Sequence, residues 1–236
     1  MIDEAIILAG GFGTRLRGVV DDMPKPLAPV AGRPFLAWVL DVLAAQGLRR
    51  AVLATGYLGE KVEAALGKTC GGMSLLYSRE SEPLGTGGAI VLATQRIEGD
   101  AFFVVNGDTW LTLDYAAFAA AKRRANARLG IALAAVPDVS RYGAVRVADG
   151  RVKGFAEKGR AGPGYINAGV YCVQRRLLDG FPGAQAFSFE SRVLVPAVAR
   201  EHVAGFLDTA GFIDIGVPED YRRAQTLFPS PACGNA

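Results

Sequence analysis

The chain has 236 residues, of which 50% are hydrophobic and 21% charged, and its formal net charge is +3. This composition predicts one globular domain and excludes a disordered chain, while the scattered basic residues favour a small anionic partner over nucleic acid. No apolar run is long enough to span a membrane, and three cysteines without metal-ligand spacing suit a reducing compartment, so we expect a cytoplasmic protein.

Strand-like apolar runs alternate with helical patterns, which predicts a Rossmann-like, doubly wound α/β sheet. The runs that indicate strands are 5–8, 51–55, 75–78, 101–106, 129–136, 144–147, 152–156, 166–173, 203–207 and 212–215. The helical patterns cover 35–46, 60–66, 88–95, 115–125, 175–181, 191–200 and 218–227. A hairpin between 144–147 and 152–156 would break the parallel order. We therefore expect a mixed sheet that the last two runs complete.

A glycine-rich loop follows the first predicted strand. The glycines at 10–13 let backbone N–H groups approach a polyphosphate, and Arg15 and Lys25 add positive charge. The loop is not a Walker A loop, which ends in Gly-Lys-Ser/Thr, nor a dinucleotide fingerprint, which needs glycine where Leu16 stands. It therefore predicts a phosphate site, with an ordinary tight turn between strand and helix as the alternative.

Two aspartates stand at the ends of apolar runs. Asp108 comes just after the run 101–106, at the carboxyl end of a strand, where open α/β sheets bind ligands. Asp214 lies in the apolar stretch 212–216, and a buried carboxylate must be paired or bound to metal. With phosphate oxygens and water, the two carboxylates suit Mg²⁺. The alternative for Asp108 is a turn that only ends the strand.

Three further segments carry polar groups with little bulk around them. A second glycine loop, 83–89, precedes a helix and predicts contact with a base or ribose, unless it is only a loop capped by Thr86. Glu157 and Lys158 close one strand and Asn167 lies inside another, which suits sugar hydroxyls or a sugar phosphate. The alternative for Glu157 and Lys158 is a surface ion pair.

The chain offers little for acid–base catalysis. Its one histidine, His202, is expected on the surface between a helix and a strand, so no Ser-His-Asp or Cys-His arrangement is available. A phosphomonoester avoids this need, because its second pKa is about 6 and it is largely a dianion near neutrality. Such a substrate can be its own nucleophile.

Seven ordered motifs give nearly the whole chain a resemblance to the sugar-1-phosphate nucleotidylyltransferases. They are Leu-Ala-Gly-Gly-Phe-Gly-Thr-Arg-Leu at 8–16, Pro-Lys-Pro at 24–26, Gly-Thr-Gly-Gly at 85–88, Asn-Gly-Asp at 106–108, Glu-Lys at 157–158, Asn-Ala-Gly at 167–169 and Asp214. The resemblance implies a single domain over 1–228 with a glycosyltransferase-A-like nucleotidyltransferase fold. Its nucleotide-binding half would cover about 1–110 and its sugar-phosphate-binding half about 111–228, with 229–236 as a flexible tail.

The resemblance also implies a reaction: transfer of a nucleoside monophosphate from an NTP to a sugar 1-phosphate, with Mg²⁺ as cofactor and pyrophosphate as second product. The catalytic residues it implies are Arg15, Lys25 and Asp108, and the metal ligands are Asp108 and Asp214. The implied nucleotide-binding residues are Leu8, Gly10, Gly11, Gly13, Thr14, Gly85, Thr86 and Gly87. Those implied for the sugar phosphate are Asn106, Glu157, Lys158, Asn167 and Gly169.

Within this family, the stretches 19–29, 188–190 and 212–221 most resemble the D-glycero-α-D-manno-heptose 1-phosphate guanylyltransferases, which favours GTP. The alternatives within the enzyme class are a mannose-1-phosphate guanylyltransferase and a hexose or muramic acid uridylyl- or thymidylyltransferase. Outside it stands a nucleotide-sugar-binding regulatory subunit, which would be expected to have lost at least one of the charged residues. A NAD-dependent oxidoreductase is less favoured, because it would need the dinucleotide-binding glycine fingerprint that this loop lacks. The oligomeric state stays open, with a homodimer as one option.

Overall fold

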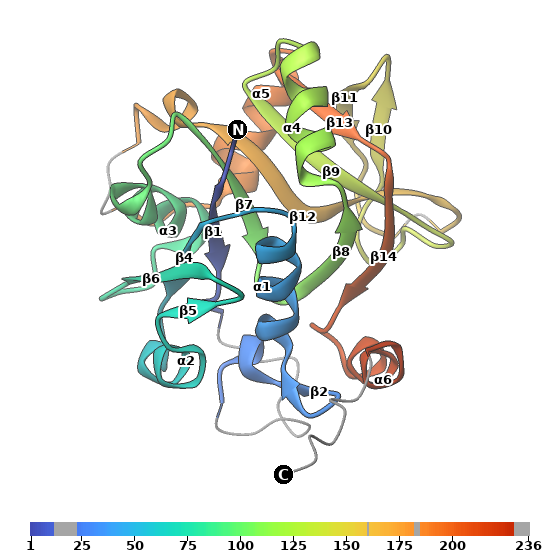
Figure 1. Cartoon of the computed structure of the whole chain (residues 1–236). Helices are drawn as coiled ribbons and strands as arrows, with labels where there is room; N and C mark the ends of the chain where they lie inside the picture. Colours follow the sequence, from blue (N-terminus) through green and yellow to red (C-terminus); the bar gives the residue numbers. More distant parts are fainter. Residues whose placement is uncertain (12–22, 160, 182–184, 229–236) are drawn as a thin grey trace.

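The structure is a computed structural model that describes residues 1–11, 23–159, 161–181 and 185–228 (Figure 1). These residues form a ten-stranded mixed sheet in the order β10-β11-β13-β9-β12-β7-β1-β4-β6-β5. Its strands are β1 (Glu4–Leu8), β4 (Arg50–Thr55), β5 (Thr69–Cys70), β6 (Met73–Arg79), β7 (Ala101–Asn106), β9 (Leu129–Val136), β10 (Val145–Ala148), β11 (Arg151–Phe155), β12 (Gly164–Gln174) and β13 (Val203–Phe206). The predicted mixed sheet is confirmed.

The first half of the chain supplies a parallel block of strands. β1 lies between β4 and β7, and β4 pairs with β6, all in parallel. The carboxyl ends of these four strands therefore meet at one edge of the sheet. β12 runs antiparallel to both β7 and β9, so it joins strands from the two halves of the chain in one sheet.

Helices cover both faces of the sheet (Figure 1). They are α1 (Phe35–Ala45), α2 (Gly59–Leu66), α3 (Gly85–Ala93), α4 (Tyr115–Arg124), α5 (Val195–Ala199) and α6 (Pro218–Leu227). Along β1 the side chains alternate: Ala5 and Ile7 pack into the cluster that includes α1 and α4, and Ile6 into the cluster with α3 and α5. Because both faces are covered, the inner strands are continuous apolar runs without polar alternation.

One predicted strand lies elsewhere than expected. The run 212–215 does not complete the main sheet; it is part of β14 (Thr209–Asp214), which pairs antiparallel with β8 (Thr109–Leu113) in a separate two-stranded sheet. β8 itself was not predicted, because its five residues alternate between apolar and polar types directly after the 106–108 turn.

Two predicted helices are shorter or irregular. The pattern over 175–181 forms only a 3-10 turn, Arg175–Leu178, and that over 191–200 is a π-helical turn, Glu190–Leu194, continued by α5. The segment after the first glycine loop also holds a 3-10 turn, Lys25–Leu27, and the hairpin of β2 (Pro29–Val30) and β3 (Arg33–Pro34), neither of which was predicted. In the part of the chain that the structure describes, no helix is long and apolar enough to cross a membrane.

Candidate active site

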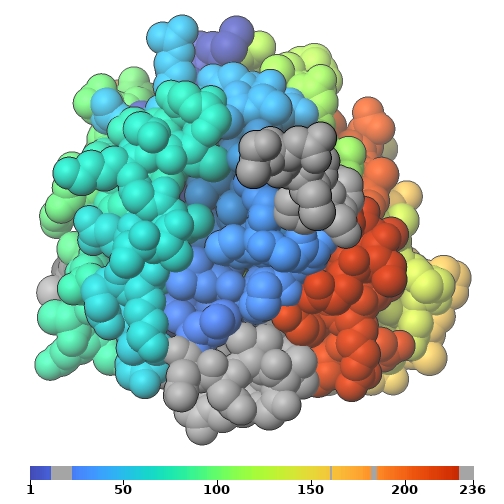
Figure 2. All heavy atoms as spheres, turned by 60° about the horizontal axis from the view of Figure 1, so that its bottom comes forward, coloured from blue at the N-terminus to red at the C-terminus, as the bar shows by residue number. Residues whose placement is uncertain are grey.

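A cleft of about 630 Å³ opens where the parallel strands end. Its lining residues follow or end strands β1, β4, β6 and β7, or belong to the start of α3 and the 3-10 turn. They are Leu8, Gly10, Gly11, Lys25, Pro26, Ala54, Gly56, Tyr57, Glu80, Ser81, Glu82, Pro83, Gly85, Thr86, Ala89, Asn106 and Asp108. A volume of this size suits a ligand as large as a nucleotide. In Figure 2 the early part of the chain, in blue, is at the centre of the face that is shown. The region of α2, in blue-green, lies on one side of it, and α6, in red, lies on the other.

The two predicted metal ligands come together. Asp108 directly precedes β8 and Asp214 ends β14, and the pairing places Asp214 opposite Thr109, while the Ile215 N–H donates to the Asp108 carbonyl at 3.0 Å. Lys25 stands between the acids: its Nζ lies 2.5 Å from Asp108 Oδ2 and 3.8 Å from Asp214 Oδ1. The three residues thus form one charged cluster, of which Lys25 and Asp108 line the cleft.

The charge of this cluster suits a divalent cation. Burial raises the pKa of Asp214, the charge of Asp108 raises it further, and Lys25 and Arg141 only partly offset this. The ionised form of Asp214 would therefore gain from a further positive charge nearby. Among the described residues no group of three or more His, Cys, Asp or Glu side chains could hold a metal. A metal bound by the two aspartates would take its other ligands from phosphate oxygens and water, which is usual for Mg²⁺.

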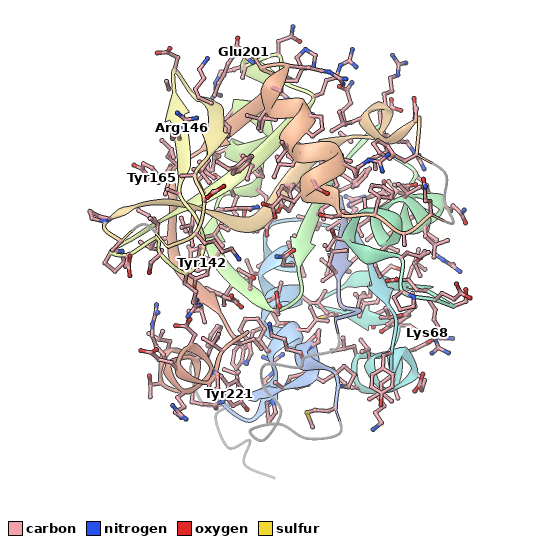
Figure 3. The ribbon with its side chains drawn as sticks, turned by 180° about the vertical axis from the view of Figure 1, so that it is seen from behind. Lys68, Tyr142, Arg146, Tyr165, Glu201 and Tyr221 are labelled. Carbon is pink, nitrogen blue, oxygen red and sulfur yellow. The ribbon has the colours of Figure 1, made fainter. Side chains whose placement is uncertain are left out.

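Arg141 supports Asp214 from the side away from Lys25. Its Nη2 lies 2.5 Å from Oδ2 of the buried Asp220 and 3.8 Å from Asp214 Oδ2, and its guanidinium lies over the ring of Tyr142, which Figure 3 labels. Asp220 is in the first turn of α6, so Arg141 connects that helix to the acid pair. The sequence analysis missed this arginine, since nothing in its surroundings marks it as close to Asp214.

The asparagine motifs at 106–108 and 167–169 touch one another. Gly169 has a φ of +72°, and a Cβ there would lie 2.8 Å from Cγ of Asn106. Asn167 shapes this bulge in β12, because its Oδ1 accepts from the Gly169 N–H and its Nδ2 donates to the Tyr171 hydroxyl. Asn106 lines the cleft. The amide of Asn167 is engaged within the protein, and its contact with a sugar stays a prediction.

The second glycine loop is only partly at the cleft. Gly85 and Thr86 line it, but Gly87 does not: a Cβ at Gly87 would lie 2.7 Å from Cζ of Phe187. The Thr86 hydroxyl accepts from the Phe189 N–H and does not cap its own helix. Gly88 likewise faces the carbonyl of Gln185, at 2.6 Å from an added Cβ. Gly87 makes room for Phe187, and its contact with a nucleotide stays a prediction.

The remaining predicted residues have different positions. Glu157 and Lys158 are exposed in the turn after β11 and do not line the cleft, and no ion pair joins them within the described ranges, so their sugar contacts stay predictions. Gly13, Thr14 and Arg15 lie outside the described residues, as does the 229–236 tail. His202 is exposed where α5 leads into β13, as predicted.

The sequence analysis also missed the cleft residues that follow β4 and β6. Gly56 and Tyr57 follow β4, and residues 80–83 follow β6. A signal for them existed, because both strands were predicted and ligands of such sheets bind beyond the carboxyl ends of the strands.

A protein-family model described as nucleotidyl transferase matches residues 4–229. The chain belongs to the nucleotidyl transferase family. It is 41% identical to a D-glycero-α-D-manno-heptose 1-phosphate guanylyltransferase of Aneurinibacillus thermoaerophilus, over 94% of this chain and 96% of the relative. A mannose-1-phosphate guanylyltransferase of Mycobacterium tuberculosis is 35% identical, over 97% of this chain and 67% of the relative.

Solved structures of the family have the same fold. The crystal structure of HddC from Yersinia pseudotuberculosis complexed with GMP-PN matches with a TM-score of 0.85 and 37% identity, covering 97% of this chain and all of that one. The fold class and the family resemblance expected from the sequence are therefore confirmed. Nucleotidyltransferases of this family typically use a divalent metal, in agreement with the donor set of the acid pair.

Proposed function

We propose that this protein transfers GMP from GTP to D-glycero-α-D-manno-heptose 1-phosphate and releases GDP-heptose and pyrophosphate. The observation that carries the reaction type is the meeting of Lys25, Asp108 and Asp214, of which Lys25 and Asp108 line a cleft of nucleotide size. The choice of GTP and heptose follows the relative from A. thermoaerophilus, which matches over nearly the full length of both chains.

The chemistry is an in-line displacement at the α-phosphorus. An oxygen of the sugar phosphate forms the new bond to phosphorus, and the bond to the oxygen that bridges to the β-phosphate breaks, so pyrophosphate leaves with that electron pair. Catalysis of this kind depends on alignment and on neutralising phosphate charge, and it needs no protein nucleophile. The absence of a suitable histidine from the cleft is consistent with that.

Each part of the site has a proposed task. The backbone at Gly10 and Gly11 and the ammonium of Lys25 bind phosphate oxygens, and Arg15 adds a second cation. Asp108 and Asp214 would hold Mg²⁺, which supplies charge neutralisation on the triphosphate when bound. The sugar phosphate is assigned to Asn106, Glu157, Lys158, Asn167 and Gly169. We place the reaction in the cytoplasm, with the product consumed in the synthesis of capsule or another surface glycan.

Pyrophosphate release tests the proposal. The protein is incubated with Mg²⁺, each of the four NTPs and a panel of sugar 1-phosphates, and GTP with the heptose 1-phosphate is expected to react fastest. The Asp108→Asn variant keeps the size of the side chain and is expected to lose about two to three orders of magnitude in kcat, with an unchanged circular dichroism spectrum. No pyrophosphate from any pair, or full activity of the variant, refutes the assignment.

A mannose-1-phosphate guanylyltransferase is the second candidate, supported by the 35% identity to the mycobacterial relative. The same panel separates the two, because only the sugar 1-phosphate differs. A regulatory subunit would bind a nucleotide or nucleotide sugar and release no pyrophosphate.

A further inference from the structure

The turn that carries Lys25 leads into the hairpin of β2 and β3. The Lys25 carbonyl accepts a hydrogen bond from the Ala28 N–H at 3.0 Å, and the Ala28 carbonyl accepts one from the Phe35 N–H at 3.0 Å, where α1 begins. Ala28 is fully buried. The base of the hairpin is therefore tied to the backbone of Lys25, and a shift of the hairpin moves the root of the lysine side chain.

This hairpin has little support of its own. Its outer register pair joins Pro29 to Pro34, and neither residue has an N–H to donate across the pair. Its turn places Ala31 at a φ of +48°, which is uncommon for alanine, and Gly32 at +80°. Two strands as short as these are held in place by contacts from outside the hairpin.

Helix α6 supplies such contacts. Gln225 bonds to the hairpin through both ends of its amide: Oε1 accepts from the Ala31 N–H at 3.0 Å, and Nε2 donates to the Pro29 carbonyl at 2.8 Å. The Tyr221 hydroxyl, one turn earlier in the helix, donates to the same carbonyl at 2.7 Å. α6 lies beside β2 in Figure 1, and Figure 3 labels Tyr221. The two donors match the two lone pairs of this carbonyl oxygen.

The helix α6 has anchors near both of its ends. Before it starts, Asp214 Oδ1 accepts from the Gly216 N–H at 2.7 Å, and a Cβ on Gly216 would lie 2.7 Å from Nζ of Lys25. After it ends, Phe228 is buried, and its ring packs against that of Trp38 with 5.4 Å between the centroids. The helix therefore connects the charged cluster to the hairpin and has a fixed place against the core.

These contacts give Gln225 a role at a distance from the reacting atoms. We propose that Gln225 is a positioning residue: its amide holds the hairpin on α6 and thereby sets where the Lys25 ammonium stands between the two aspartates of the charged cluster. Tyr221 shares this task through its hydroxyl. One helix thus fixes Asp214, which precedes it, relative to the lysine. The inference rests on the proposed function only insofar as Lys25 binds a triphosphate.

Gln225→Met is the variant that tests this role. Methionine removes both hydrogen bonds of the amide and keeps an unbranched side chain, and the exposed position of Gln225 allows the change without a cavity. Thr226→Ala is the matched control, because Thr226 is the next residue of α6, is exposed and uncharged, and donates to the Arg223 carbonyl within the same helix. Circular dichroism checks that both variants are folded.

A double-variant cycle by urea unfolding separates positioning from simple support of the hairpin. Gln225→Met is made in the unsubstituted protein and in Lys25→Met, and unfolding is measured with chelator at pH 7. The midpoint is expected to fall more in the unsubstituted protein than in Lys25→Met, where the ammonium has already been removed. Equal falls in the two backgrounds overturn the proposal, and so does the same difference with Thr226→Ala.

Calorimetry with GTP and with guanosine, both with Mg²⁺ and without sugar phosphate, tests the consequence for a ligand. Gln225→Met is expected to weaken GTP binding by roughly two- to tenfold, equivalent to about one hydrogen bond, and to leave guanosine binding unchanged. Equal weakening of both ligands, or of neither, contradicts the positioning of Lys25 for phosphate. If the unsubstituted protein does not bind GTP, the proposed function falls, and the unfolding cycle still decides the role of Gln225.

Discussion

Replacing Lys25 by methionine tests whether its ammonium holds the acid pair together. Methionine keeps an unbranched apolar side chain and removes the charge. In the folded protein, the side chain of Lys25 is 14% exposed and those of Asp108 and Asp214 are 32% and 24% exposed. The variant would therefore leave two partly desolvated carboxylates facing each other.

The expected loss of stability follows from these contacts. Two unit charges 4 Å apart interact by about 4 kcal/mol at an effective dielectric constant of 20, which is the scale of the 3.8 Å contact between Lys25 and Asp214 before screening by water. Water reaches all three side chains, so the loss is smaller than the 3–5 kcal/mol typical for breaking a fully buried pair. We expect Lys25→Met to lower the free energy of unfolding by about 1–3 kcal/mol at neutral pH.

Urea unfolding at pH 7, with chelator and with Mg²⁺, is the assay. Mg²⁺ should restore part of the loss in Lys25→Met, because a cation that binds only the native acid pair stabilises it by mass action. The unsubstituted protein should gain less, since its ammonium already occupies that position. Lys68→Met, at an exposed lysine next to β5 (Figure 3), is the control and should change little. A loss below about 0.5 kcal/mol, or equal stabilisation of both proteins by Mg²⁺, refutes the reasoning.

Three other substitutions probe the supports of the cleft by urea unfolding. Gly87→Ala should cost about 1–3 kcal/mol by overpacking against Phe187, and the double variant with Phe187→Ala should lose less than the sum of the single losses; strict additivity would contradict the contact. Arg141→Gln should cost about 1–3 kcal/mol, because it leaves Asp220 with less compensation, and an unchanged midpoint would rule this out. Burial raises the pKa of Glu80, which means that the folded state binds its proton more tightly than the unfolded state, so this carboxylate lowers stability as pH rises through its native pKa. Glu80→Gln should accordingly be at least as stable as the unsubstituted protein at pH 7, and any gain in stability should disappear toward about pH 4. A variant that is less stable than the unsubstituted protein at pH 7 would contradict this.

Much of the sheet could be predicted from the sequence, because its inner strands are buried on both faces. The runs 101–106 and 51–55 are continuous in apolar residues, a pattern that is easy to recognise. Asp108 was predicted from its place beyond such a run, and Asp214 from the cost of burying an unpaired carboxylate. Both arguments use local sequence and one general rule, and the structure brings the two acids together.

What the sequence did not reveal depends on partners far along the chain. β8 alternates apolar and polar residues like many exposed segments, and its pairing with β14 brings Asp108 close to Asp214. A glycine looks the same whether its missing side chain makes room for a ligand or for another part of the protein. At Gly87, which we predicted to contact the nucleotide, the structure shows close packing against Phe187. Arg141 gave no local signal, because its acidic partners lie in β14 and α6.

The pairing of β8 with β14 has a consequence for synthesis on the ribosome. A chain leaves the ribosome with its amino end first, so the parallel strands whose ends line the cleft can assemble early. Asp214 emerges only after β9 to β13 have been made, and until then the growing chain lacks one acid of the Asp108–Asp214 pair. Cleavage by a protease ahead of Thr209 would return a finished molecule to the same incomplete state. The acid pair therefore exists only in chains that extend through β14.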